Sequence, residues 1–146
     1  MKKLLLLLFS ILISINSYSH EDWKDFIEYA NGTYYVNNQS YHRLGDHTYW
    51  WSMCDCEASN GAYMSYQIYN QGYISNSQNV MHKELIYVTF QESMGEGPGE
   101  IILGDNEWIN DDNDSSMENV VRSVSIWASA KNMEHTDEHL RELLGD

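Results

Sequence analysis

The sequence predicts an α+β domain: an antiparallel sheet of about five to six strands, formed as a meander of hairpins, with one C-terminal amphipathic helix packed on one face. The first observation is that Asn-Gly pairs at 31–32 and 60–61 lie between runs of β-rich residues. This dipeptide favours two-residue hairpin turns. The second is that short β-rich runs continue between glycines as far as residue 109. The third is that apolar residues after Ser115 recur at helical spacing.

The first 19 residues have the pattern of a secretory signal peptide. Lys2 and Lys3 precede an apolar run over residues 4–15 and a small-residue exit, Ser17-Tyr18-Ser19. This run is shorter than a membrane span, so we expect cleavage after Ser19 and no membrane insertion of the mature chain. The predicted location is the periplasm, the cell surface or the extracellular space.

Charge restricts the partners of the mature chain. Removal of Lys2 and Lys3 lowers the formal net charge from −14 to −16, with histidines counted as neutral. Such acidity argues against nucleic acids and anionic membrane surfaces, which would repel the protein. It is typical of a soluble exported protein and is compatible with basic protein partners.

Residues 20–132 are expected to form one domain. Around the first Asn-Gly pair, residues 23–29 and 33–36 are expected to form a hairpin, with a short helix over 23–29 as the alternative. The polar residues 37–46 are expected to form a connection, and residues 71–79 are expected to form a loop. Further strands are expected over residues 84–92, 101–103 and 107–109.

The central hairpin, residues 47–70, is expected to turn at Asn60-Gly61, with Ser59 opposite Ala62. This register places Cys54 opposite Gln67 and assigns each side chain to one of two faces. The predicted core face holds Tyr49, Trp51, Met53, Met64, Tyr66 and Ile68. The other face holds Trp50, Ser52, Cys54, Cys56, Tyr63, Ser65, Gln67 and Tyr69.

The C-terminal helix is expected to begin at a capping box formed by Ser115 and Glu118, preceded by acids that favour the positive end of the helix dipole. Its apolar stripe should cover the predicted core face. The stripe consists of Met117, Val120, Val121, Val124, Trp127 and Ala128. Residues 133–146 are expected to form either a short helix over 137–144 or a loosely held tail.

Exposed aromatic side chains beside amides provide contact area at a low cost in rotamer entropy. The predicted partner-binding residues are therefore Trp50, Tyr63, Gln67 and Tyr69. The alternative is that their face packs on a second layer or on a second copy of the chain, giving a homodimer.

Cys54 and Cys56, beside Met53, form an alternative site that could bind a soft metal such as Cu(I) or exchange disulfides. A bond between them would close a small strained ring, which argues against pairing. The spacing of His135, Glu138 and His139 matches inverted zinc peptidases, and the acids over 112–118 resemble the start of a calcium loop, but both patterns are incomplete. With no catalytic motif, the sequence predicts no enzyme and no cofactor.

A series of landmarks follows a recognisable order along residues 23–125. They are Trp23, Asn31-Gly32-Thr33-Tyr34-Tyr35, Arg43, Gly45, Tyr49-Trp50-Trp51, Gly61-Ala62-Tyr63-Met64-Ser65, Tyr87, Met94-Gly95-Glu96-Gly97, Trp108, and Ser115 or Ser116. This order resembles the surface-adhesin protein E family of Gram-negative bacteria. The resemblance implies a sheet with a C-terminal helix, self-association, no enzymatic activity, and adhesion to host proteins such as laminin, vitronectin and plasminogen. The chain lacks the two cysteines that the family places near residues 69–71 and 123.

The sequence therefore predicts an exported, non-enzymatic binding or adhesion module whose partner is a host matrix or plasma protein or a second copy. One alternative is a periplasmic soft-metal or thiol-redox protein that uses Cys54 and Cys56. Another is a periplasmic inhibitor of a basic partner protein.

Overall fold

The structure is a computed structural model that describes residues 22–75, 79–112 and 114–144, with no description of the side chains of Ser115 and residues 133–144. The predicted signal peptide, residues 1–19, lies outside the described residues. No helix among the described residues combines the length and apolarity needed to cross a membrane.

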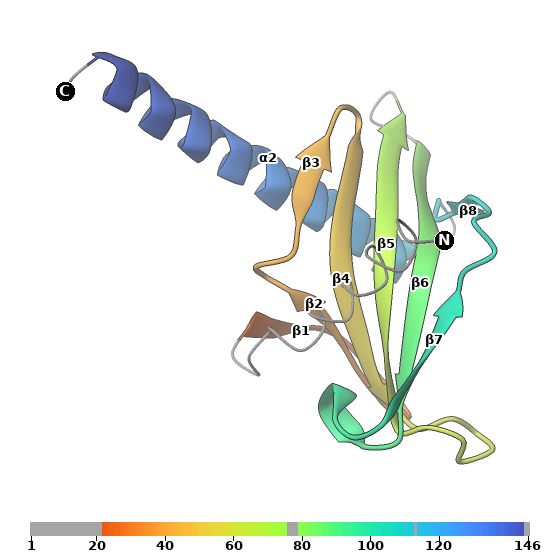
Figure 1. The fold of residues 1–146 in the computed structure, drawn as a ribbon. Helices are drawn as coiled ribbons and strands as arrows, with labels where there is room; N and C mark the ends of the chain where they lie inside the picture. The colour runs from red at the N-terminus through yellow and green to blue at the C-terminus, as the bar shows by residue number, and fades with distance from the viewer. Residues whose placement is uncertain (1–21, 76–78, 113, 145–146) are drawn as a thin grey trace, which may run out of the picture.

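Eight strands form one antiparallel sheet, and a long helix follows them (Figure 1). The strands are β1 (Trp23–Tyr29), β2 (Gly32–Asn37), β3 (His42–Leu44), β4 (His47–Cys56), β5 (Ser65–Ser75), β6 (Asn79–Phe90), β7 (Gly99–Leu103) and β8 (Ile109–Asn110). Their order is β1-β2-β4-β5-β6-β7, with β3 paired to β4 and β8 to β6. A 3₁₀ turn, η2 (Ser93–Gly95), precedes β7. The α+β prediction is confirmed, but the sheet has more strands than expected, and β3 lies within the predicted connection 37–46.

The register of the central hairpin differs by one residue from the prediction. Cys54 pairs with Tyr66, whereas the predicted turn placed it opposite Gln67. Residues 57–64 connect the two strands, so the turn at Asn60, where the amide of Ala62 donates to Asn60 Oδ1 at 3.0 Å, is only part of a longer loop. A shift of one residue moves one strand's side chains to the opposite face. The predicted grouping of β4 and β5 side chains is therefore wrong.

The helix α2 (Ser115–Leu144) lies behind the sheet in Figure 1 and covers the face that carries Trp50, Cys54 and Cys56. Its predicted apolar stripe does face the sheet, with Val120, Val121, Val124 and Ala128 fully buried. The β5 residues Tyr66 and Ile68 lie on this side as predicted. The assignment of β4 is reversed, because Trp51 and Met53 lie on the other face, in a second cluster with Trp23, Val88 and Phe90.

Glycine at position 72 lets the helix approach the sheet closely. A Cβ there would lie 2.8 Å from Trp50 Cζ3 and 3.0 Å from Val121 Cγ1. Both distances are shorter than normal carbon contacts, so the side chains of Trp50 and Val121 occupy the space that any larger residue would need.

Asp114, rather than the predicted Ser115, caps the start of α2. Its Oδ1 accepts hydrogen bonds from the amides of Ser116 at 3.0 Å and Met117 at 3.2 Å. Asp114 is thus one of the acids expected near the positive end of the helix, and its short side chain satisfies two of the amides that lack helical partners. The backbone of α2 is one continuous helix to Leu144, where the sequence predicted a separate short helix or a loose tail.

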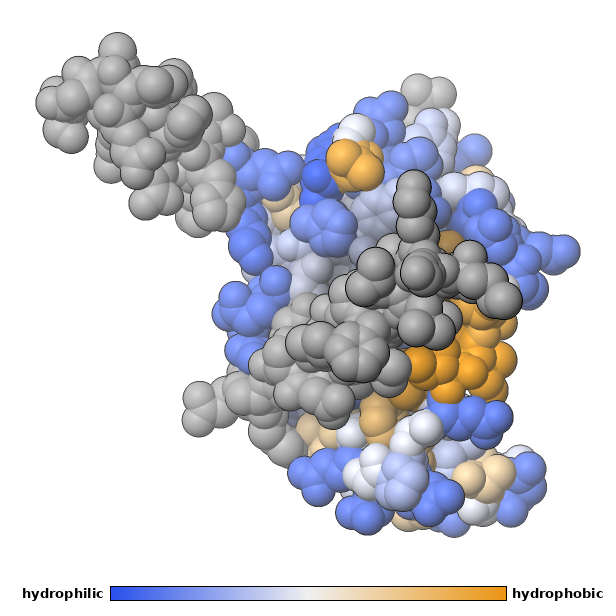
Figure 2. All heavy atoms as spheres, viewed as in Figure 1, coloured by the Kyte–Doolittle hydropathy of each residue, from blue (hydrophilic) through white to orange (hydrophobic). Residues whose placement is uncertain are grey.

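The outer edge of the sheet at β7 is apolar on its surface. Figure 2 shows apolar atoms gathered in this region, and Leu103 and Ile102 are 75% and 48% exposed. The rest of the visible described surface is mostly hydrophilic (Figure 2), as the composition predicts.

Candidate binding pocket

A pocket of about 450 Å³ lies on the helix side of the sheet, beside the first turn of α2. Its floor includes Tyr34, Cys54 and Tyr66, which are direct neighbours across β2, β4 and β5. Its rim comes from the β1–β2 turn, the loop over residues 57–64 and Met117 of the helix. The pocket therefore forms where strands β2, β4 and β5 meet the start of α2, and its shape depends on how these three strands pair.

Four tyrosines line this pocket: Tyr29, Tyr34, Tyr63 and Tyr66. The rings of Tyr63 and Tyr66 stand almost perpendicular, at 84°, with centroids 5.7 Å apart. Burial raises the pKa of Tyr29, Tyr34 and Tyr66. These phenols therefore stay neutral at physiological pH and offer aromatic faces and hydroxyl groups instead of negative charge.

Cys54 and Cys56 are joined by a disulfide in the floor of the pocket. The sequence argued against this bond, but the two side chains share one face of the strand and their Cα atoms are 5.1 Å apart. That separation lies within the usual range of about 4.4 to 6.8 Å. Both residues are buried, so the disulfide forms a compact apolar part of this floor.

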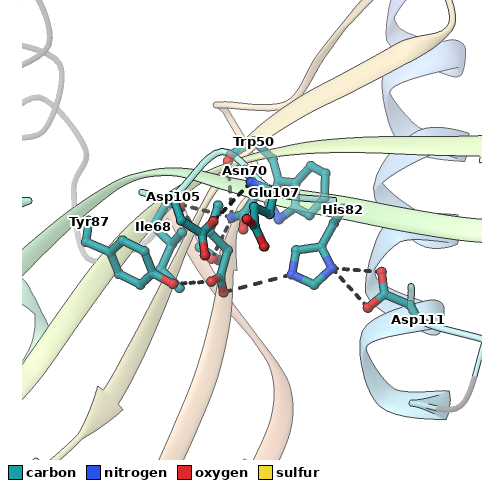
Figure 3. Close-up of polar contacts among 10 residues, drawn as sticks. Trp50, Ile68, Asn70, His82, Tyr87, Asp105, Glu107 and Asp111 are labelled. Carbon is teal, nitrogen blue, oxygen red and sulfur yellow. Dashed lines mark hydrogen bonds and ion pairs between the residues drawn. The ribbon is translucent and has the colours of Figure 1, made fainter. Parts of the chain in front are cut away.

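Glu84 brings a carboxylate to the pocket and belongs to a chain of polar side chains behind it. Glu84 Oε2 accepts a hydrogen bond from the Tyr87 hydroxyl, and Glu84 Oε1 lies 3.9 Å from His82 Nε2. On the other side of the ring, His82 Nδ1 lies 2.9 and 2.8 Å from the two Asp111 oxygens (Figure 3). His82 is 4% exposed and Asp111 is 2% exposed.

Each charge in this network has an identifiable cause. Burial alone would lower the pKa of His82, but the hydrogen bonds to Asp111 and the ion pair with Glu84 outweigh burial and raise it to about 9. The neighbouring His82 imidazolium in turn lowers the pKa of Glu84. At neutral pH the protonated imidazole therefore joins two carboxylates, and the group retains one net negative charge, with Glu84 at the pocket end.

A β-bulge makes the contact between Glu84 and Tyr87 possible. Residues three apart on a regular strand point to opposite faces. Here Tyr69 pairs with Ile86 while Asn70 pairs with Glu84, so Leu85 is the extra residue and both side chains reach the helix side. The amide of Gly104 donates to Leu85 O at 3.0 Å, and a Cβ on Gly104 would overlap the Glu84 carbonyl.

Between the pocket floor and this network lies a buried polar cluster. Asn70 Nδ2 donates to Ser52 Oγ at 2.8 Å and to Ile68 O at 3.0 Å. Three buried polar atoms of this region make no hydrogen bond of normal geometry with the described residues: Tyr34 OH, Trp50 Nε1 and Asn70 Oδ1. The Tyr34 hydroxyl belongs to a residue that lines the pocket and interacts with Ser52 and Trp50 beneath the floor.

The four residues predicted to bind a partner do not form one surface. Trp50 is 0% exposed under the helix, and Gln67 and Tyr69 lie on the opposite face beside Trp51 and Met53. Tyr63 alone lines the pocket. The cause is the one-residue shift, which separates Trp50 from the β5 residues assigned to its face. Sequence reasoning missed Tyr29, Tyr34 and Glu84 as site residues, although the first two lie beside an Asn-Gly turn.

The described residues contain no group of three or more His, Cys, Asp or Glu side chains arranged to hold a metal ion. Two acids of the calcium-like segment have other contacts, since Asp112 Oδ1 accepts from the Val80 amide at 3.0 Å and Asp114 caps the helix. The side chains of His135, Glu138 and His139 lie outside the described residues.

Comparison with known proteins identified no relative. Neither a family model, nor a curated protein, nor a solved structure matches this chain.

Proposed function

We propose that this protein is an exported, non-enzymatic binding module and that the tyrosine-lined pocket is its recognition site. One observation carries the proposal: a single concave site of about 450 Å³ joins four aromatic rings to an ionised carboxylate. Pockets of this size that combine apolar walls with a few convergent polar groups are the usual form of binding sites. The proposed partner is a host matrix or plasma protein, or a second copy of the chain.

The chemistry of the pocket supports binding better than catalysis. His82 is the obvious candidate for a general base, but it is buried, faces carboxylates on both sides and remains protonated at neutral pH. A general base needs a free electron pair near the working pH. The cysteines are joined to each other, so a soft-metal or thiol function would first require their reduction.

The experiment is a binding measurement with the mature protein against immobilised laminin, vitronectin, plasminogen and the protein itself. The pocket variant carries Tyr29→Ala and Tyr63→Ala, which truncate two rim side chains. The matched control is Tyr73→Ala, which truncates a partly buried tyrosine on the opposite face of β5. We expect the pocket variant to lose binding to a partner that the wild type and the control both retain.

Thermal unfolding of each variant separates loss of a binding surface from loss of the fold. If a folded pocket variant binds normally and Tyr73→Ala loses binding, the binding site lies on the face of the sheet opposite the helix. If the wild type binds none of these proteins and does not associate with itself, the proposed partner class is wrong.

A further inference from the structure

We propose that the pocket is an aromatic cage for a cation and takes an alkylammonium or guanidinium group. This inference rests on the proposed function and specifies its ligand. Such a group could be the end of a lysine or arginine side chain on a basic partner, or a small free amine.

The arrangement of the rings provides the first argument. A cation is attracted to the face of an aromatic ring, because the ring quadrupole places negative charge there. The ring of Tyr63 on the rim meets the ring of Tyr66 in the floor at 84°, and Tyr29 and Tyr34 contribute further rings from β1 and β2. Glu84 lines the same pocket as Tyr34 and Tyr66 and brings its carboxylate to these rings.

The balance of charge around the pocket provides the second argument. Glu57 and Glu84 line it, and among the described lining residues there is no lysine, arginine or histidine. The His82 imidazolium lies behind Glu84, and Asp111 binds its far side. No described lining residue would neutralise the charge of an anionic ligand, whereas a positively charged ligand would contact carboxylates and neutral aromatic rings.

The start of α2 does not reverse this conclusion. Helix N-termini attract anions through free amides and the positive end of the dipole. Here the Asp114 carboxylate already accepts hydrogen bonds from the amides of Ser116 and Met117. The same carboxylate acts on Tyr29 at the rim, so it adds negative charge to this end of the pocket.

Two lysines elsewhere in the molecule already make the proposed type of contact. Lys83 Nζ lies 4.6 Å from the centroid of the Trp108 ring, and Lys131 Nζ lies 5.1 Å from that of Tyr41. The pocket differs because its rings enclose space that no side chain of the described residues fills. Its volume of about 450 Å³ would hold the end of a long basic side chain.

The experiment is calorimetric titration of the mature protein with choline and with 3,3-dimethylbutan-1-ol, a neutral molecule of nearly the same shape. We expect choline to bind at least about tenfold more tightly, since a desolvated cation–π contact contributes about 2 kcal/mol. A titration with Nα-acetyl-lysine amide identifies the source of the cation. Tighter binding than that of choline favours a lysine or arginine side chain of a partner, and weaker binding favours a small free amine.

Variants at Tyr63 test the role of the ring itself. Tyr63→Phe keeps an aromatic face and Tyr63→Leu keeps only an apolar one, so Leu should weaken choline binding by about three- to thirtyfold relative to Phe. Glu84→Gln should also weaken it, with little effect on the neutral probe. Equal loss in Phe and Leu would indicate that the hydroxyl matters and would overturn the cage.

The outcomes separate this inference from the proposed function. Equal binding of choline and the neutral probe, with partner binding still lost in the pocket variant, would leave the binding module intact and refute the cation. Failure of every cationic probe to bind would also refute the cage. If the pocket variant in addition retains its partner, the proposed function fails as well.

Discussion

Replacement of His82 by glutamine should remove the alkaline pH dependence of stability. The imidazole lies between Asp111 and Glu84 and is buried with both of its nitrogens directed at carboxylates. Glutamine keeps a polar side chain of similar reach but cannot bind a proton in this range. The variant should therefore be less stable at neutral pH, and its free energy of unfolding should change less as the pH rises above neutral.

The sign of the effect follows from proton binding. The pKa of His82 is raised from 6.5 to about 9, so the folded state keeps a proton that the unfolded chain releases between these values. Stability is then fully present below about pH 6.5 and is lost as the pH rises to about 9. At about 1.4 kcal/mol per pH unit, the loss is about 3 kcal/mol.

The assay is urea unfolding followed by tryptophan fluorescence across this pH range, with the disulfide intact. His42→Gln, at an exposed histidine, is the matched control and should keep the wild-type slope. A wild-type free energy of unfolding that is constant between pH 6.5 and 9 would refute the reasoning. A slope that persists in His82→Gln would assign the titration to another group. At acidic pH, the lowered pKa of Glu84 predicts a separate loss of stability as the pH falls below its ordinary value.

Two further substitutions test the packing of the helix. Asp114→Ala removes the acceptor for the amides of Ser116 and Met117 and should lower the free energy of unfolding by about 1 kcal/mol. Urea unfolding measures this change, and an unchanged free energy would show that the cap does not stabilise the fold. Gly72→Ala places a Cβ 2.8 Å from Trp50 Cζ3 and should lower the melting temperature at a cost of about 1 to 3 kcal/mol. The backbone of Gly72 is not in the positive-φ region, so this cost is steric; Gly61→Ala, where a Cβ meets no atom within 4 Å but φ is +69°, provides the contrast of backbone strain without a steric clash.

The parts of the fold that sequence could predict are those set by local periodicity. The helical stripe from Met117 to Ala128 recurs within a few turns, and the structure buries it as expected. The β-rich runs gave the class of the fold for the same reason. The bulge at Leu85 has no local signature, although it is what brings Glu84 and Tyr87 together.

The candidate site could be predicted only in part, because it is assembled by pairing between distant strands. Tyr63 was predicted as an exposed aromatic residue on one face of the central hairpin. The row formed by Tyr34, Cys54 and Tyr66 depends on two registers, β2 with β4 and β4 with β5. An Asn-Gly pair indicates a turn, but it does not say whether two residues or the whole segment 57–64 connect the strands.

The ambiguous orientation of β4 has a physical origin in its composition. Trp50, Trp51, Met53 and Cys54 are all buried, although they alternate between faces. A strand that is apolar on both sides fits either orientation by hydrophobicity alone, so its orientation must be decided by shape. On the helix side, the large Trp50 ring lies over Gly72, where there is no side chain to displace it. In the reversed orientation the helix side would instead carry Tyr49 and Trp51, and Cys54 would leave the row of Tyr34 and Tyr66. The fit of Trp50 over Gly72 thus places the disulfide among the tyrosines, and Gly72→Ala should disturb the pocket as well as the core.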